Sequence, residues 1–162
     1  MRVLVACEFS GVVREAFRAR GHDAWSCDLL PAADSSPYHY QGDILGMLMY
    51  SYLPDDVQWD LMIAHPPCTY LTSAGMHWTT RGLRDPQLTE DAIAFVQMLF
   101  DAPIPRIAVE NPIGVLSTRI RKPDQIIQPW QFGHDASKAT CLWLKNLPPL
   151  EPTSTVEPRI VN

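Results

Sequence analysis

Three short, uninterrupted apolar runs constrain the fold of this chain more than any other feature. They are Val3–Cys7, Leu61–Ala64 and Ile107–Val109. A strand that is apolar on both faces is typical of the centre of a parallel sheet, because helices cover both faces of such a sheet. A helix-like stretch opens at Ser10 and ends at Gly21, and residues 88–100 carry apolar residues at helical spacing. The alternation predicts one α/β domain with a doubly wound, mostly parallel sheet.

The remaining elements follow from shorter patterns. Residues 23–27 are predicted as a second strand, and residues 140–144 as a late strand. A loop rich in Ser, Pro and Tyr is predicted over residues 31–40, and a second loop over residues 124–133. We expect residues 146–162, which are rich in proline, to form an extended tail.

Size, charge and cysteine content narrow the class of protein. A chain of 162 residues that is 46% hydrophobic can bury a full core without disulfides or a metal, so we expect a single domain over residues 1–162. Net charge is −5 and the basic residues are dispersed, which argues against tight, unaided binding of duplex DNA. Cys7, Cys27 and Cys141 lie in apolar runs, where buried thiols are expected. No signal peptide or membrane-spanning run is seen, and we expect a cytoplasmic protein.

Polar residues follow the predicted strands at the end where a doubly wound sheet binds its ligands. They are Glu8–Gly11, Asp28, Asp43, His65–Cys68 and Glu110-Asn111. An acid after the second strand is the usual partner of ribose hydroxyls. The first turn has one glycine where a dinucleotide-binding turn has three, so the sequence favours a nucleoside without phosphates, such as S-adenosylmethionine. Taken singly, Asp28 and Asp43 are equally typical of residues that cap loops.

Cys68 and Glu110 are the candidate catalytic pair. Cys68 follows two prolines at the end of one apolar run, and Glu110 precedes an Asn-Pro pair at the end of another. A thiolate is a strong nucleophile, and a carboxyl group beside it supplies acid-base catalysis. Alone, a Pro-Pro-Cys turn is more often a buried turn than a nucleophile. The Glu-Asn-Pro motif at the matching position of a second strand reverses that preference.

The order of these motifs resembles the catalytic half of the cytosine-C5 DNA methyltransferases. The motifs, within residues 2–145, are Phe9-Ser10-Gly11, Asp28, Gly42-Asp43-Ile44, Pro66-Pro67-Cys68 and Glu110-Asn111-Pro112. The resemblance implies a Rossmann-like methyltransferase fold, in a small form like those of phages and prophages, with S-adenosylmethionine as the cofactor. The cofactor site that it implies consists of Phe9, Ser10, Gly11, Val12, Asp28, Leu29, Asp43, Ile44 and Pro67.

The resemblance also implies the chemistry. Cys68 would add to C6 of cytosine while Glu110 binds N3 and the exocyclic amine, after which C5 takes up the methyl group. Asn111 would brace the loop around Cys68 or Glu110. The implied substrate-binding residues are Pro66, Asn111, Lys138 and Thr140. Two of these residues differ from the family's motif. Lys138 would keep one positive charge of that motif, whereas Thr140 stands in place of its arginine.

Two further departures concern the cofactor turn and the size of the chain. Val13 and Arg14 stand where the family has two more glycines, which narrows the room beside the methionine group. No segment matches the family's target-recognition domain, so a second copy of the chain or an accessory protein would supply target choice. Met76-His77-Trp78 is placed in the loop after Cys68, where it either stacks on a substrate base or forms a plain surface loop.

Three functions stay open. The first is methylation of cytosine in DNA, with the base flipped into the site. The second is the same reaction on a free cytosine nucleotide such as dCMP. The third is a catalytically silent subunit that binds S-adenosylmethionine, which the intact Cys68 and Glu110 disfavour. The isolated histidines, among them His65, show no metal-ligand spacing, so hydrogen-bonded structural roles and no metal are expected.

Overall fold

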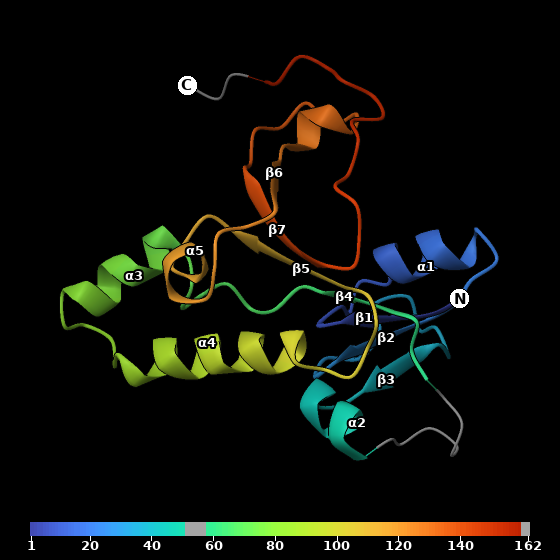
Figure 1. Ribbon diagram of the computed structural model, residues 1–162, viewed down its shortest axis with the longest axis horizontal. Helices are drawn as coiled ribbons and strands as arrows, with labels where there is room; N and C mark the ends of the chain where they lie inside the picture. Colours follow the sequence, from blue (N-terminus) through green and yellow to red (C-terminus); the bar gives the residue numbers. More distant parts are fainter. Residues whose placement is uncertain (51–57, 160–162) are drawn as a thin grey trace.

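A seven-stranded sheet forms the centre of the protein, whose computed structural model describes residues 1–50 and 58–159 (Figure 1). The strands are β1 Arg2–Ala6, β2 Asp23–Asp28, β3 His39–Gln41, β4 Leu61–Ala64, β5 Ile107–Pro112, β6 Gln125–Ile127 and β7 Thr140–Lys145. Their order is β3-β2-β1-β4-β5-β7-β6. Neighbours from β3 to β5 are parallel, while β7 runs antiparallel to both β5 and β6. This arrangement confirms the predicted doubly wound, mostly parallel sheet.

Helices cover both faces of the sheet, as continuous apolar strands require. The helices are α1 Val12–Arg18, α2 Ile44–Tyr50, α3 Ser73–Thr80, α4 Gln87–Phe100, α5 Leu116–Arg119 and the 3-10 helix η1 Pro129–Gln131. Along β1, Val3 and Val5 belong to the core on the α1 side, whereas Leu4 and Ala6 belong to the core shared with α2 and α4. All four side chains are fully buried. Two buried faces on one strand explain the absence of polar alternation there.

The end of α1 follows the predicted glycine cap. The His22 N–H donates to the Phe17 carbonyl (3.2 Å) and the Gly21 N–H to the Arg18 carbonyl (2.9 Å). Gly21 has φ +80°, a conformation that residues with a Cβ rarely adopt. This paired hydrogen-bond pattern stops the helix and turns the chain into β2.

Three local expectations were wrong. Met76, His77 and Trp78 lie in α3, where a loop was expected. The helix begins because the Thr72 hydroxyl accepts from the Gly75 N–H (3.0 Å), and none of its residues is buried, so its sequence carries no amphipathic period. The predicted loop over residues 124–133 contains β6 and η1, and the loop over residues 31–40 ends inside β3. A strand of three residues forms because a neighbouring strand pairs with it, and it is too short to show an alternating pattern in the sequence.

The chain beyond β7 is extended, as expected, over the part that the structure describes. It folds back on η1, where the Val156 N–H donates to the Trp130 carbonyl (2.9 Å). Arg159 forms an ion pair with Asp135 (2.6 Å). Together with β6, β7 and η1 this tail forms the projection at the top of Figure 1. Among the described helices, none is long and apolar enough to cross a membrane.

Candidate active site

The turn after β4 and the carboxyl-terminal half of β5, which extends to Pro112, are joined by side-chain hydrogen bonds. The Asn111 Nδ2 donates to the Pro66 carbonyl (2.9 Å), and Asn111 is 1% exposed. Beside it, His65 Nδ1 lies 3.2 Å from Glu110 Oε2. The parallel pairing of β4 with β5 brings these residues together across 45 positions of sequence. Asn111 therefore braces the turn that leads to Cys68, as the sequence analysis expects.

A second set of contacts joins the segment after Cys68 to the segment after β5. The Val115 N–H donates to the Leu71 carbonyl (2.8 Å), and Thr72 forms an isolated bridge with Gly114. A Cβ on Gly114 would lie 2.8 Å from the Leu71 carbonyl carbon and 2.9 Å from the Thr72 Cα. Gly114 therefore permits a backbone approach that no other residue allows without movement of the chain.

Cys68 begins the first of these segments. Its carbonyl accepts from the N–H groups of Leu71 and Thr72 (3.0 Å each), which fixes the turn after it. Its side chain is half-buried, and no hydrogen bond to the thiol is found in the described part of the chain. The Cys68 thiol thus has its position set by the backbone and its sulfur left without a protein partner there.

The other thiols near this edge are held in their protonated form. Burial raises the pKa of Cys7 to about 12, with Asp28 and Asp43 adding to the rise. Burial likewise raises the pKa of Cys27 to about 12, with Cys7 as the next contributor. Since a thiol must lose its proton to attack, neither is a nucleophile near neutral pH. Cys68 remains the candidate.

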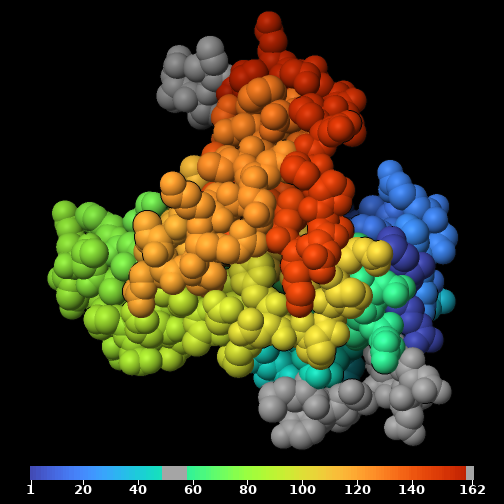
Figure 2. Space-filling view, in the orientation of Figure 1, coloured from blue at the N-terminus to red at the C-terminus, as the bar shows by residue number. Residues whose placement is uncertain are grey.

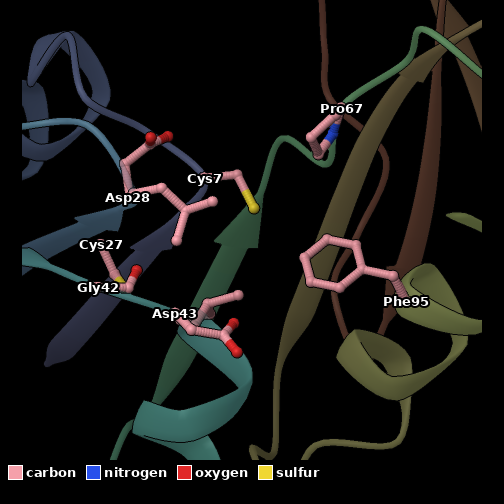
Figure 3. A pocket seen from close by; sticks show the side chains of 9 residues that line it. Cys7, Cys27, Asp28, Gly42, Asp43, Pro67 and Phe95 are labelled. Carbon is pink, nitrogen blue, oxygen red and sulfur yellow. The ribbon is translucent and has the colours of Figure 1, made fainter.

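A cavity of about 110 Å³ opens at the carboxyl ends of β1, β2 and β4 (Figure 3). Its lining residues are Cys7, Cys27, Asp28, Leu29, Gly42, Asp43, Ile44, Pro67 and Phe95. The sheet order reverses between β1 and β4, and doubly wound sheets bind their ligands at this switch point. In Figure 3 the Cys7 sulfur points into the space that Asp28, Asp43 and Pro67 surround. Five of the predicted cofactor residues therefore meet here, namely Asp28, Leu29, Asp43, Ile44 and Pro67.

Each of the two carboxylates that line the cavity uses one of its oxygens to cap a loop. Asp28 Oδ1 accepts from the Leu30 N–H (2.9 Å), and Asp43 Oδ1 accepts from the Leu45 N–H (3.0 Å). No hydrogen bond to either Oδ2 is found within residues 1–50 and 58–159. Each side chain thus caps a loop with one oxygen, and the described residues offer no hydrogen-bond donor to the other.

The remaining four predicted cofactor residues lie outside the cavity lining. Phe9 is 45% exposed and Val12 is 71% exposed. The Ser10 hydroxyl donates to Glu8 Oε1 (3.2 Å). Gly11 has φ +76° and is packed against the Arg14 side chain. The Phe-Ser-Gly turn begins two residues after Cys7 of the cavity wall, and Phe9 and Val12 are exposed to solvent.

The start of α1 is filled by the protein's own charges. Glu8 is buried, and its carboxylate accepts from the N–H groups of Val13 (2.7 Å) and Arg14 (3.2 Å). Arg14 is fully buried, donates to Ser26 Oγ (2.7 Å), and forms ion pairs with Asp34 and Glu15. The helix N-terminus that binds phosphate in dinucleotide folds is thus occupied by a carboxylate, which agrees with a ligand lacking a pyrophosphate.

The remaining predicted substrate residues lie near β5 or at the surface. Pro66 is buried with its carbonyl bound to Asn111. Thr140 opens β7 directly opposite Pro112, and its hydroxyl donates to the Lys138 carbonyl (3.1 Å). Lys138 itself is exposed. Thr140 therefore lies on the strand next to Glu110. Within the part of the chain that the structure describes, no hydrogen bond or ion pair of the Lys138 side chain joins it to the site.

Sequence reasoning missed five residues of this edge. They are Cys7, Cys27, Gly42 and Phe95 in the cavity wall, and His65 beside Glu110. The two thiols and Phe95 were expected as core residues, and half-buried cavity walls carry the same apolar signal as a core. Among the described residues, no group of three or more His, Cys, Asp or Glu side chains is placed to hold a metal ion.

Comparison with known proteins defines the class of fold. No family model and no curated protein matches the sequence. A solved structure from E. coli, described as a candidate DNA modification methyltransferase encoded within a prophage, matches with a TM-score of 0.60 and 16% sequence identity. The match covers 89% of this chain and 46% of that chain, so this chain spans about half the length of that structure. The similarity confirms a Rossmann-like methyltransferase fold for this protein.

Proposed function

We propose that the protein is an S-adenosylmethionine-dependent methyltransferase that modifies C5 of cytosine in DNA, with Cys68 as the nucleophile. The observation that carries the proposal is the position of Pro67. Pro67 lines the cavity with the two available carboxylates, and it is the residue directly before Cys68. A ligand in the cavity and a base at Cys68 would therefore share one edge of the sheet, next to Glu110 on β5.

The cavity suits the nucleoside part of S-adenosylmethionine. Asp28 and Asp43 each offer a carboxylate oxygen to ribose hydroxyls, and Leu29, Ile44 and Phe95 offer apolar contacts to a base. No lysine or arginine lines the described cavity, so a phosphate would meet two negative charges and no positive one. When bound, S-adenosylmethionine supplies an electrophilic methyl group.

The chain's own residues account for the activation of cytosine. The Cys68 thiolate adds to C6, which turns C5 into an enamine carbon able to attack. Once C5 carries the methyl group, a base removes the C5 proton and the C6–sulfur bond breaks, which restores the aromatic ring and releases the Cys68 thiolate. Glu110 binds N3 and the exocyclic amine, and so stabilises the charge that the addition places on the ring. His65 Nδ1 at Glu110 Oε2 would hold that carboxyl group, and Asn111 holds the turn that carries Cys68. General acid-base assistance of this kind contributes on the order of 100- to 10,000-fold.

Methyl transfer to three substrates tests the proposal. The full chain is incubated with methyl-labelled S-adenosylmethionine and, in parallel, duplex DNA, single-stranded DNA or dCMP, and the product is digested to nucleosides to locate the label. Label in 5-methylcytosine from DNA is the expected result. Label in dCMP alone would make the protein a nucleotide-modifying enzyme instead. Binding of S-adenosylmethionine without transfer to any substrate would favour the silent subunit.

Asp28→Asn is expected to weaken S-adenosylmethionine binding by roughly 10- to 100-fold, because a charged acceptor for ribose hydroxyls is lost. Isothermal titration calorimetry measures the dissociation constant. Glu151→Gln removes the same charge from an exposed position in the tail and should leave binding unchanged. Equal affinity in Asp28→Asn and wild type would mean that the cofactor site lies elsewhere.

His65→Phe is expected to lower kcat by roughly tenfold or more with little change in KM, because Glu110 Oε2 loses its neighbouring donor. His65→Asn is the matched variant, since its Nδ2 stands close to the position of His65 Nδ1 and can donate the same bond. Steady-state kinetics should therefore show substantial recovery in His65→Asn. A phenylalanine variant as active as the asparagine variant would remove His65 from the mechanism.

A further inference from the structure

A groove of about 420 Å³ runs between α3 and α5, on the side of the molecule away from β3 (Figure 1). Its lining residues are Ser73, Met76, His77, Thr80, Gly114, Val115 and Thr118. In Figure 2 the green surface of α3 adjoins the orange surface that follows β5. The proposed reaction uses none of these residues.

The two walls of the groove begin close in sequence to Cys68 and to Glu110. Its α3 wall begins at the helix cap Thr72, four residues after Cys68, and its other wall begins at Gly114, four residues after Glu110. The Thr72–Gly114 bridge joins the two walls at their start. A polymeric substrate that places one of its residues at Cys68 would therefore place the following residues in the groove.

The two segments that form the groove differ in charge from the rest of the protein. Residues 61–84 and 111–123 contain five of the 13 basic residues and none of the 18 acidic residues. Arg119 pairs with Glu90 (2.6 Å) and Arg121 with Asp124 (2.8 Å), both acids from flanking segments. No ion pair of Arg81 or Lys122 is found among the described residues. In a protein of net charge −5, two segments that contain no acid and carry the unpaired Arg81 and Lys122 favour an anionic partner.

An aromatic stacking surface lies next to the groove. Trp78 is 50% exposed, and its ring contacts that of the groove residue His77 edge-on, with centroids 5.9 Å apart. The hydroxyls of Thr80 and Thr118 donate to carbonyls of their own segments (3.2 and 3.0 Å). The Ser73 hydroxyl and the His77 ring are left to contact phosphate oxygens. An exposed aromatic ring, a groove lined by no acidic residue and cations in the adjoining segments form a combination suited to unpaired nucleotides.

We propose that the groove between α3 and α5 binds single-stranded polynucleotide, and that it holds the nucleotides next to the cytosine presented to Cys68. The proposal rests on the proposed function and narrows its substrate to an unpaired strand. Duplex DNA would need a broad basic stripe, whereas an unpaired strand gains binding free energy from stacking of its bases on aromatic rings as well as from cations that contact its backbone. A free nucleotide would make no use of the groove.

Binding of a fluorescent oligodeoxycytidylate tests the proposal without any methyl transfer. The Cys68→Ala protein is titrated by fluorescence anisotropy in the absence of S-adenosylmethionine. Trp78→Ala in that background is expected to weaken binding by roughly 5- to 100-fold, through loss of base stacking. Arg81→Gln should weaken binding and make it less dependent on salt concentration. The matched controls Tyr38→Ala and Arg20→Gln change an exposed aromatic and an exposed cation near α1, and both should bind as tightly as the parent.

The outcomes separate the groove from the chemistry. Loss of binding in the two groove variants with retention in the two controls supports the proposal. Equal binding in all four variants, or duplex bound at least as tightly as the single strand, overturns it. Groove-dependent binding together with no methyl transfer would sink the proposed function and leave the groove standing. Methyl transfer to DNA, with equal binding of the oligonucleotide by all four variants, would overturn the groove proposal and leave the proposed function standing.

Discussion

Cys68→Ala is expected to lower methyl transfer by about 1,000-fold or more and to leave S-adenosylmethionine affinity nearly unchanged. The thiol has no hydrogen-bond partner in the described part of the chain, and the turn is fixed by the Cys68 carbonyl, which alanine retains. The fold and the neighbouring cavity should therefore survive the change. Transfer of labelled methyl groups to DNA and calorimetric titration of the cofactor measure the two effects separately.

Cys141→Ala is the matched control for the loss of a thiol. Cys141 is 1% exposed on β7, opposite Asn111, and burial raises its pKa, with Glu110 adding to the rise. Its replacement should lower the melting temperature modestly and preserve transfer. Transfer by Cys68→Ala at the wild-type rate would rule out attack by this thiolate, whatever the substrate.

The sequence predicted best those features that depend on local pattern. The continuous apolar run of β1 reflects burial on both faces, and Gly21 marks a left-handed residue that ends α1. In each case a single physical requirement leaves its trace on a few adjacent residues.

Features that depend on the meeting of distant segments were missed. His65 touches Glu110 only because β4 pairs with β5, and neither motif carries a sign of the other. Cys7 looks like a core residue, yet its φ of +60° places it at the end of β1 with its thiol in the cavity wall. The exposed helix α3 lacks an apolar face and so was mistaken for a loop.

The approach of the segments that follow Cys68 and Glu110 depends on one residue without a side chain, Gly114. The Leu71 carbonyl accepts from Val115, and the Thr72–Gly114 bridge lies beside this bond. Leu71 is 1% exposed, so the contact is anchored in the core and cannot shift freely. Any Cβ at position 114 must push the segment after Cys68 away from the end of β5, which carries Glu110.

Gly114→Ala is therefore expected to lower the free energy of unfolding by about 3 kcal/mol, and the melting temperature by roughly 6–12 °C. Methyl transfer should fall even in the fraction that remains folded, because Cys68 and Glu110 move apart, while cofactor affinity changes less. Gly46→Ala is the control, since a Cβ there meets a single atom within 4 Å, the Asp43 Cβ at 4.0 Å. A helical Gly→Ala change is favourable by up to about 1 kcal/mol, so Gly46→Ala should be neutral or stabilising. Thermal unfolding of both variants decides the matter, and a Gly114→Ala protein as stable as Gly46→Ala would show that the two turns are not held together at this point.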